Sequence, residues 1–312
     1  MSLVAASPSL LSLPLHGWEP APALDLIAGG YVLLYLWGVR RVGARHWPPA
    51  RIAASVAGVA VVLVALQSGL EAYDDRLLSA HMLQHVLLLM VAPPLLLLGT
   101  PVLLALRSLP PSRGPALTAL LMRARRLTSP PVCLAVFTAV VVGLHVPPVF
   151  DRAVRDPLLH GCEHAAFLAA GCFLWWPLSD AGPVPARRLG SIGRIFYMLA
   201  AMVPEDLIGA YLNHANWVLY APYGASAHAL GISAVIDQQR AGAIMWVGSS
   251  CIMAAGGLCS AMAMMAVEER RSSAAMARML AEAQRTQRIE APAPIPAATA
   301  LSPDVAVARG PT

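Results

Sequence analysis

The chain has 312 residues, of which 57% are hydrophobic and only 12% are charged, and its mean hydropathy is +0.62. A soluble domain carries about 25% charged residues, so the composition excludes an ordinary soluble protein. The net charge is +5, and the sequence contains no Lys, so all 22 of its Lys and Arg residues are Arg. These arginines lie between apolar runs and indicate membrane topology. The sequence therefore predicts a lipid bilayer as the surroundings and no nucleic-acid partner.

Seven apolar runs approach the roughly 20 residues that cross a hydrocarbon core. The predicted spans are residues 24–39, 52–70, 77–98, 131–146, 158–178, 192–212 and 241–267. Within the third span, Pro93-Pro94 is expected to end or kink the helix, because proline removes a backbone donor and clashes with the preceding turn. The predicted fold class is all-α, a polytopic membrane protein with a bundle of about seven transmembrane helices.

The arginines are distributed unevenly between the two sides of the predicted bundle. The loops after the first, third and fifth spans hold 18 of them together with the C-terminal tail. The opposite side holds only Arg76, Arg152, Arg155 and Arg240. Because arginine-rich loops stay in the cytoplasm, we expect the N-terminus outside and the C-terminus in the cytoplasm.

This topology divides the chain into three parts. Residues 1–23 form an external N-terminal segment, and residues 24–267 form the seven-helix domain. Residues 268–312 form a cytoplasmic tail that begins as a short helix. The tail ends in an Ala/Pro-rich stretch that we expect to be disordered.

Two pairs of histidines open the third and fifth spans on the outer side. His81 and His85 form one pair, and His160 and His164 form the other. The spacing of four residues puts both imidazoles of a pair on one helical face, about 6 Å apart along the axis. Polar side chains inside a bilayer usually face a partner or a cavity, and imidazole is the commonest metal ligand. We expect the four histidines to share a metal site, although packing or hydrogen bonding explains many single membrane histidines.

The sixth span carries adjacent carboxylates, Glu205 and Asp206, roughly 10 Å from its outer end and near the expected level of the histidine pairs. We expect them to help hold the cation. Met198 and Met202 share a helical face with Glu205, and thioether with imidazole suits Cu(I) better than Mg²⁺ or Ca²⁺. The possible accessory ligands are His145, Met202, His214 and Asp237.

Two of the acidic residues have simpler interpretations. Glu163 lies between His160 and His164 in the sequence and is expected to point to a different face. Asp237 lies three residues before Arg240, so a local ion pair is the alternative to a role at the metal.

The stretch His81-Met82-Leu83-Gln84-His85 continues to Ala92-Pro93-Pro94 and Gly99-Thr100-Pro101. It resembles the third-span motif of the CtaG-type cytochrome c oxidase assembly factors. Two further stretches resemble the same family. They are residues 145–148 with His160-Gly161-Cys162-Glu163-His164 and Trp175-Trp176-Pro177-Leu178, and Asp237-Gln238-Gln239 with Ala241-Gly242 and Met245-Trp246.

The resemblance implies a multi-pass protein of the bacterial plasma membrane that is not an enzyme. Such a protein would assemble haem–copper oxidase in contact with cytochrome c oxidase subunits, and the histidines suggest copper as the metal. Two alternatives remain open, a membrane haem-binding or redox protein and a copper transporter. A retinal protein is excluded, because a chain without Lys offers no Schiff-base amine.

The orientation can be tested with fusions to alkaline phosphatase, which is active only outside the cytoplasm. We expect a fusion after residue 290 to be inactive and a fusion after residue 155 to be active, because arginine-rich segments are retained inside. The measurement is phosphatase activity in intact cells, normalised to the amount of fusion protein. An active fusion after residue 290 would show that the predicted orientation is inverted.

Overall fold

The computed structural model describes residues 13, 17–110, 112–179 and 189–290. The predicted external segment lies mostly outside these residues, and the predicted disordered end of the tail lies entirely outside them. Every regular element in the described ranges is helical, which confirms the all-α prediction. The chain divides into two units, Met1–Ala261 and Met262–Thr312.

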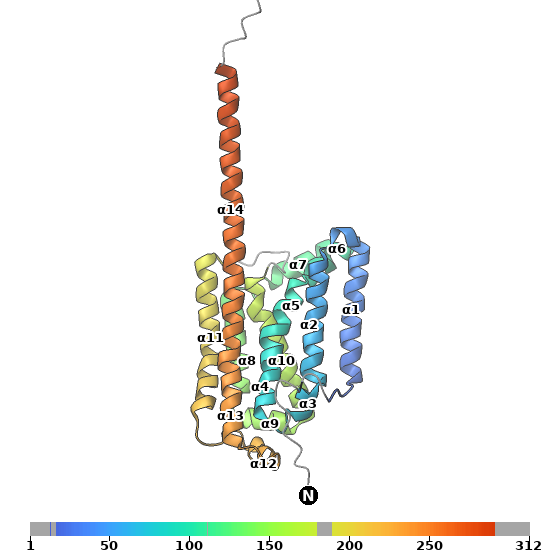
Figure 1. Ribbon diagram of the computed structural model, residues 1–312. Helices are drawn as coiled ribbons and strands as arrows, with labels where there is room; N and C mark the ends of the chain where they lie inside the picture. The colour runs from blue at the N-terminus through green and yellow to red at the C-terminus, as the bar shows by residue number, and fades with distance from the viewer. Residues whose placement is uncertain (1–12, 14–16, 111, 180–188, 291–312) are drawn as a thin grey trace, which may run out of the picture. The chain divides into compact units, whose positions relative to one another are not determined.

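The helices of the first unit run side by side, with α3, α9 and α12 at one end and α6 and α7 at the other (Figure 1). They are α1 (Pro22–Val42), α2 (Pro49–Gln67), α3 (Gly69–Tyr73), α4 (Leu78–Val86), α5 (Ala92–Leu98), α6 (Pro101–Ser108), α7 (Gly114–Ala124), α8 (Pro130–Leu144), α9 (Pro147–Arg155), α10 (Pro157–Trp175), α11 (Ser191–His214), α12 (Ala221–Ala229) and α13 (Ala234–Ala243). Helix α14 (Ser249–Glu290) begins in the first unit and makes up the described part of the second.

The structure confirms a multi-pass membrane protein. Within the described ranges, five helical segments are long and apolar enough to cross a bilayer: Pro22–Val42, Pro49–Tyr73, Leu78–Ser108, Ile192–His214 and Ala234–Leu258. Helices α8 and α9 meet at 73° and make a sixth if they form one span. The predicted span 158–178 corresponds to α10, which falls outside this set of apolar helices because it carries His160, Glu163 and His164. The number seven therefore stays a prediction.

The last apolar span begins at Ala234, seven residues before the predicted start. The Ser233 side chain accepts a hydrogen bond from the Ile236 amide and so caps the first turn of α13. Asp237 and Arg240 interrupt the apolar run in the sequence, which is why the helix appears shorter there than it is.

Pro93-Pro94 does not end the helical run, and a kink at these residues stays a prediction. A π-helical turn, Leu87–Val91, precedes the prolines, which then lie in the first turn of α5. A first turn needs no donor from these residues. The break comes later, at Thr100, whose φ of 48° is left-handed and which directly precedes Pro101 at the start of α6.

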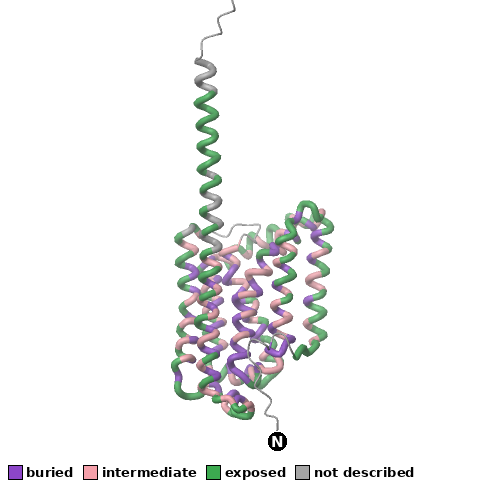
Figure 2. The backbone as a smooth tube through the Cα atoms, viewed as in Figure 1, coloured by how far each residue is buried: buried purple, intermediate pink, exposed green. Residues whose placement is uncertain are grey.

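Helix α4 is the most enclosed part of the bundle, since eight of its nine residues are buried. Buried residues concentrate on it and on the helices around it (Figure 2). Helix α10 packs directly against the π-helical turn and α5, and Gly171 makes this approach possible. A Cβ at position 171 would lie 2.5 Å from both the Leu89 carbonyl oxygen and Pro93 Cγ. Small residues allow such close helix contacts in membranes.

Gly171→Ala should therefore destabilise the bundle. The added methyl meets backbone on one side and a rigid ring on the other, and overpacking of this kind costs about 1–3 kcal/mol. Gly161→Ala on the same helix is the matched control, because a Cβ there has nothing within 4 Å. The measurement is thermal unfolding in detergent. Equal melting temperatures for the two variants would contradict the tight contact.

Candidate metal centre

Helices α4 and α10 bring the two predicted histidine pairs face to face. The ring centroids of His81 and His85 lie 4.2 Å apart, and those of His160 and His164 lie 4.3 Å apart. Between the helices, His81 and His160 are 4.9 Å apart and His85 and His164 are 5.9 Å apart. His145, at the end of α8, joins them with its ring 5.9 Å from that of His85. These five residues are called the histidine cluster below.

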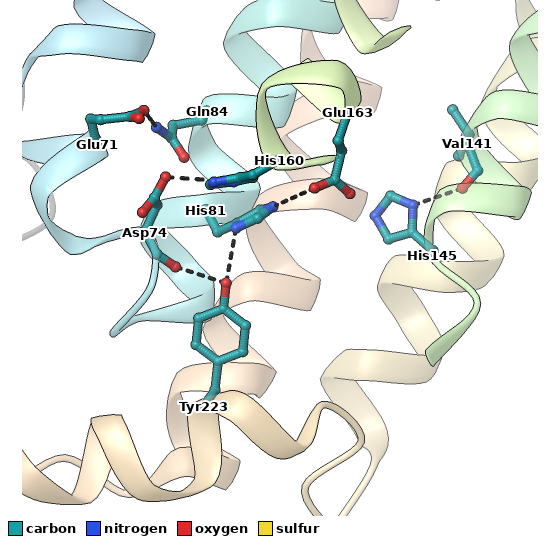
Figure 3. Close-up of polar contacts among 9 residues, drawn as sticks. All are labelled: Glu71, Asp74, His81, Gln84, Val141, His145, His160, Glu163 and Tyr223. Atoms are coloured by element: carbon teal, nitrogen blue, oxygen red, sulfur yellow. Dashed lines mark hydrogen bonds and ion pairs between the residues drawn. The ribbon is translucent and has the colours of Figure 1, made fainter. Parts of the chain in front are cut away.

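Two carboxylates that the sequence did not assign to the site also lie at the histidine cluster (Figure 3). Glu163 Oε2 is 3.7 Å from His81 Nε2, and Asp74 Oδ2 is 3.6 Å from His160 Nε2. The expectation that Glu163 points away was wrong, because Glu163 and His164 both lie on the buried face of α10, whereas Gly161 and Cys162 are exposed. Its distance of three residues from His160 was the available signal. Asp74 precedes α4, and no local spacing in the sequence connects it with the site.

Most polar atoms of this group have no hydrogen-bond partner among the described residues. The buried, unpartnered atoms are Asp74 Oδ2, His81 Nε2, His85 Nδ1 and Nε2, His145 Nε2, His160 Nε2, Glu163 Oε1 and Oε2, and His164 Nε2. Each such atom costs about 1–3 kcal/mol, and native proteins rarely leave them unpaired. A cation bound among them would remove much of this cost.

The ligand atoms form three overlapping sets, and within each set they all lie within 4.8 Å of one another. The sets are His81 with His85 and His164, Asp74 with His160 and His164, and His81 with His160 and Glu163. In a tetrahedral site with bonds of 2.0–2.1 Å, ligand atoms lie about 3.4 Å apart. The measured contacts of 3.6 and 3.7 Å are close to this value.

The surroundings of Asp74 also favour a cation. This residue lies between two spans, and burial, with Glu71 and Asp75 nearby, raises the pKa of its carboxyl group to about 8. The raised pKa means that ionisation is costly here unless a positive charge compensates it.

Tyr223 on α12 determines which nitrogen of His81 is free. Its hydroxyl donates to the Asp74 carbonyl oxygen at 2.7 Å and lies 2.8 Å from His81 Nδ1. Since a carbonyl only accepts and a hydroxyl has one proton, His81 Nδ1 must donate to the Tyr223 oxygen. Burial raises the pKa of Tyr223 well above its ordinary value, so the hydroxyl keeps its proton. His81 Nε2 therefore carries the lone pair on the side of Glu163.

His145 is oriented by the same logic. Its Nδ1 lies 2.7 Å from the Val141 carbonyl oxygen, which can only accept, so Nδ1 is protonated. The unpartnered Nε2 then carries the lone pair. Metal-binding histidines commonly donate their second ring nitrogen to a carbonyl or another acceptor in this way.

The structure does not bring the predicted carboxylates of the sixth span to the histidine cluster. Glu205 is buried beside Ser249, and Asp206 Oδ1 accepts a hydrogen bond from Ser250 Oγ at 2.9 Å. Helix α11 turns this face toward the last span, against which it packs. Met202 packs against the main hydrophobic core.

His214 is exposed, and its Nδ1 contacts the Ala210 carbonyl oxygen at 2.8 Å. Among the described residues, none of the three ligand sets contains Glu205, Asp206 or His214. Their side chains therefore take part in contacts within α11 or with the last span.

Residues 33–266 match the model of the cytochrome c oxidase caa3 assembly factor family, Caa3_CtaG. The chain belongs to this family. Uncharacterized proteins of Mycobacterium bovis and Mycobacterium tuberculosis are each 33% identical over 231 residues, which cover 71% of this chain and 34% of each relative. An uncharacterized protein of Mycobacterium leprae is 31% identical over 227 residues, 70% of this chain and 34% of its own. The chain thus spans about a third of the length of these relatives, and no solved structure matches it significantly.

In this Caa3_CtaG protein, Asp237 stabilises the start of the helix that carries His81. Its carboxylate accepts hydrogen bonds from the Leu78 amide at 2.7 Å, the Ser79 amide at 3.4 Å and the Ser79 hydroxyl. These groups form the first turn of α4, the helix that carries His81. Asp237 is therefore the cap of that helix and is absent from the three ligand sets of the described residues.

The next residue, Gln238, holds the loop before α12. Its side chain accepts from the Leu219 amide at 2.7 Å and donates to the Trp217 carbonyl oxygen at 2.9 Å. This loop leads to Tyr220 and Tyr223, so the start of the last span positions both the helix of His81 and the tyrosine that contacts it.

Tyr223→Phe should allow His81 to adopt either tautomer, because the acceptor of its Nδ1 proton is lost. We expect altered ¹⁵N signals of one histidine in the metal-free protein and a stability loss of about 1–3 kcal/mol from the unpaired groups. Tyr220→Phe is the matched control, since this buried hydroxyl donates to the His145 carbonyl oxygen at 2.9 Å and not to an imidazole. Identical histidine spectra for the two variants would disprove the tautomer assignment.

Proposed function

We propose that this protein handles copper during the assembly of haem–copper cytochrome c oxidase and binds Cu(I) at the histidine cluster. The observation that carries this proposal is the group of nine buried, unpartnered ligand atoms on five histidines and two carboxylates. Membership of the Caa3_CtaG family supports the connection with the oxidase. The role is that of an assembly factor that binds and releases a metal rather than an enzyme.

The chemistry of the donors favours copper over harder cations. The set of His81, His85 and His164 is made of imidazole alone, and such nitrogen donors suit copper and zinc rather than magnesium or calcium. All three residues are buried. A monovalent ion costs less to bury than a divalent one, which favours Cu(I) at this set.

The position of the site supports exchange with the outer side of the membrane. The histidine cluster is built by α4, the N-terminal half of α10 and the end of α8, at the end of the bundle that carries α3, α9 and α12 (Figure 1). Arg76 and Arg152, which belong to the side with few arginines, lie at this end of the bundle. By the positive-inside rule, we place it outside the plasma membrane, in reach of cytochrome c oxidase subunits.

The two alternatives receive less support. A haem would need flat space beside its axial histidines, whereas Phe167 lies 4.1 Å from His85 and Phe150 lies 5.1 Å from His81, centroid to centroid. A transporter would need ligands that continue across the membrane. The three ligand sets found in the described part of the chain share residues and all lie at one end.

His85→Ala and His164→Ala should each weaken Cu(I) binding by at least about tenfold, or 1.4 kcal/mol, because each removes a donor from the imidazole set. The measurement is competition with a chromophoric Cu(I) chelator, using the purified protein in detergent. His214→Ala is the control, since this exposed histidine is absent from the ligand sets. Unchanged affinity in both cluster variants would refute copper binding at this site, and a Soret band in the purified protein would favour haem.

The same variants should lower oxidase activity in the host while the abundance of this protein stays unchanged, as measured in its membranes. The reason is that copper loading requires the donors but the fold does not. Equal loss of the protein itself in the cluster variants would show that the histidines serve the fold alone.

A further inference from the structure

The three ligand sets differ in chemistry and share residues. We call His81, His85 and His164 the inner set, and Asp74, His160 and His164 the outer set. The inner set contains only imidazole, whereas the outer set includes a carboxylate. His164 belongs to both sets, so an ion bound to its imidazole is already in reach of either set.

The two sets lie at different depths in the bundle. His85 and His164 each follow their partner by four residues, which places them about 6 Å further along α4 and α10. Asp74 precedes α4 altogether. Exposure supports this order at His160, whose side chain is 14% exposed against 0% for His81, whereas Asp74, His85 and His164 are all buried to a similar extent. The outer set therefore lies closer to the aqueous phase.

We propose that the outer and inner sets are successive stations for one cation, which the outer set captures and the inner set retains. This inference rests on the copper-binding function proposed above. The passage is an exchange of ligands without oxidation or reduction. The bonds to Asp74 Oδ2 and His160 Nε2 break as bonds to nitrogens of His81 and His85 form, while His164 stays bound throughout.

Glu163 makes the passage less costly. The third ligand set contains His81 from the inner set, His160 from the outer set and this buried carboxylate. A cation that moves between the stations thus stays close to a negative charge, which offsets the cost of moving a charge into the low-dielectric interior.

Asp74→Asn tests the relay, because the amide keeps the shape of the side chain but cannot bind a cation as a carboxylate. The Asp74 carbonyl, which accepts from Tyr223, is untouched. We would measure the rates of Cu(I) uptake from and return to a chromophoric chelator by stopped flow, together with the equilibrium affinity. We expect uptake and release to slow by at least about tenfold each, with little change in affinity. His85→Ala should instead speed release and weaken the affinity.

Asp75→Asn is the matched control, since Asp75 is the exposed neighbour of Asp74 and its loss removes the same charge. Its uptake rate should stay close to that of the unmodified protein. If it slows uptake as much as Asp74→Asn, general electrostatic attraction explains the effect and the relay is wrong. The relay is also wrong if Asp74→Asn leaves the rates unchanged or weakens the affinity as much as His85→Ala. If the unmodified protein binds no Cu(I), the proposed function itself fails. A thermal melt of Asp74→Asn verifies that its fold is intact.

Discussion

The close approach of α10 to the helices that follow α4 is the constraint on which the rest of the site depends. Gly171 permits it, because any side chain at this position would overlap the Leu89 carbonyl and the Pro93 ring. Because α10 lies this close to the continuation of α4, the histidine pair of α10 comes within contact distance of the histidine pair of α4. Asp237 then caps the first turn of α4 and ties this helix to α13, so the position of the His81 and His85 pair is held from a second side as well. The geometry of the ligands thus depends on a missing side chain and a helix cap, neither of which is a ligand.

The group around these histidines is costly for a protein that binds nothing. Buried polar side chains normally find hydrogen-bond partners, as Asp237 and Gln238 do. Outside the cluster, Glu205 Oε2 and Asp151 Oδ1 are also without one, but the described residues with nine such atoms in one group are those at the cluster. At the cluster, one ring nitrogen of His81 contacts the Tyr223 hydroxyl and one of His145 contacts the Val141 carbonyl, whereas neither nitrogen of His85 has a hydrogen-bond partner among the described residues. Local violations of this kind are expected at functional sites.

The sequence could predict what depends on helical periodicity. The apolar runs gave the fold class, and the spacing of His81 with His85 and of His160 with His164 gave their common faces. What depends on the packing of whole helices could not be predicted. The position of Glu205 along its helix follows from counting residues. The direction of its side chain depends on which helix packs against α11, and that helix belongs to the last span. Asp74 and Tyr223 come from different connections between helices, and only the folded chain places them together.

The stretches that resemble the Caa3_CtaG family divide into two physical kinds. One kind supplies atoms that could bind a metal ion, as in residues 81–85 and 160–164. The other kind shapes the backbone that holds them. At the far end of the bundle, Gly99 is such a residue, because a Cβ there would lie 2.7 Å from Ser55 Cβ, and its carbonyl accepts from the Tyr35 hydroxyl at 2.7 Å. Gln84, between the two histidines of α4, donates to the Glu71 carboxylate at 2.8 Å and to the Ala65 carbonyl at 2.9 Å. It thereby ties α2 and α3 to the ligand-bearing helix. A motif can therefore mark a candidate metal site although many of its residues supply no candidate ligand atom, because polar atoms in a bilayer can be left without partners only where the backbone around them is firmly held.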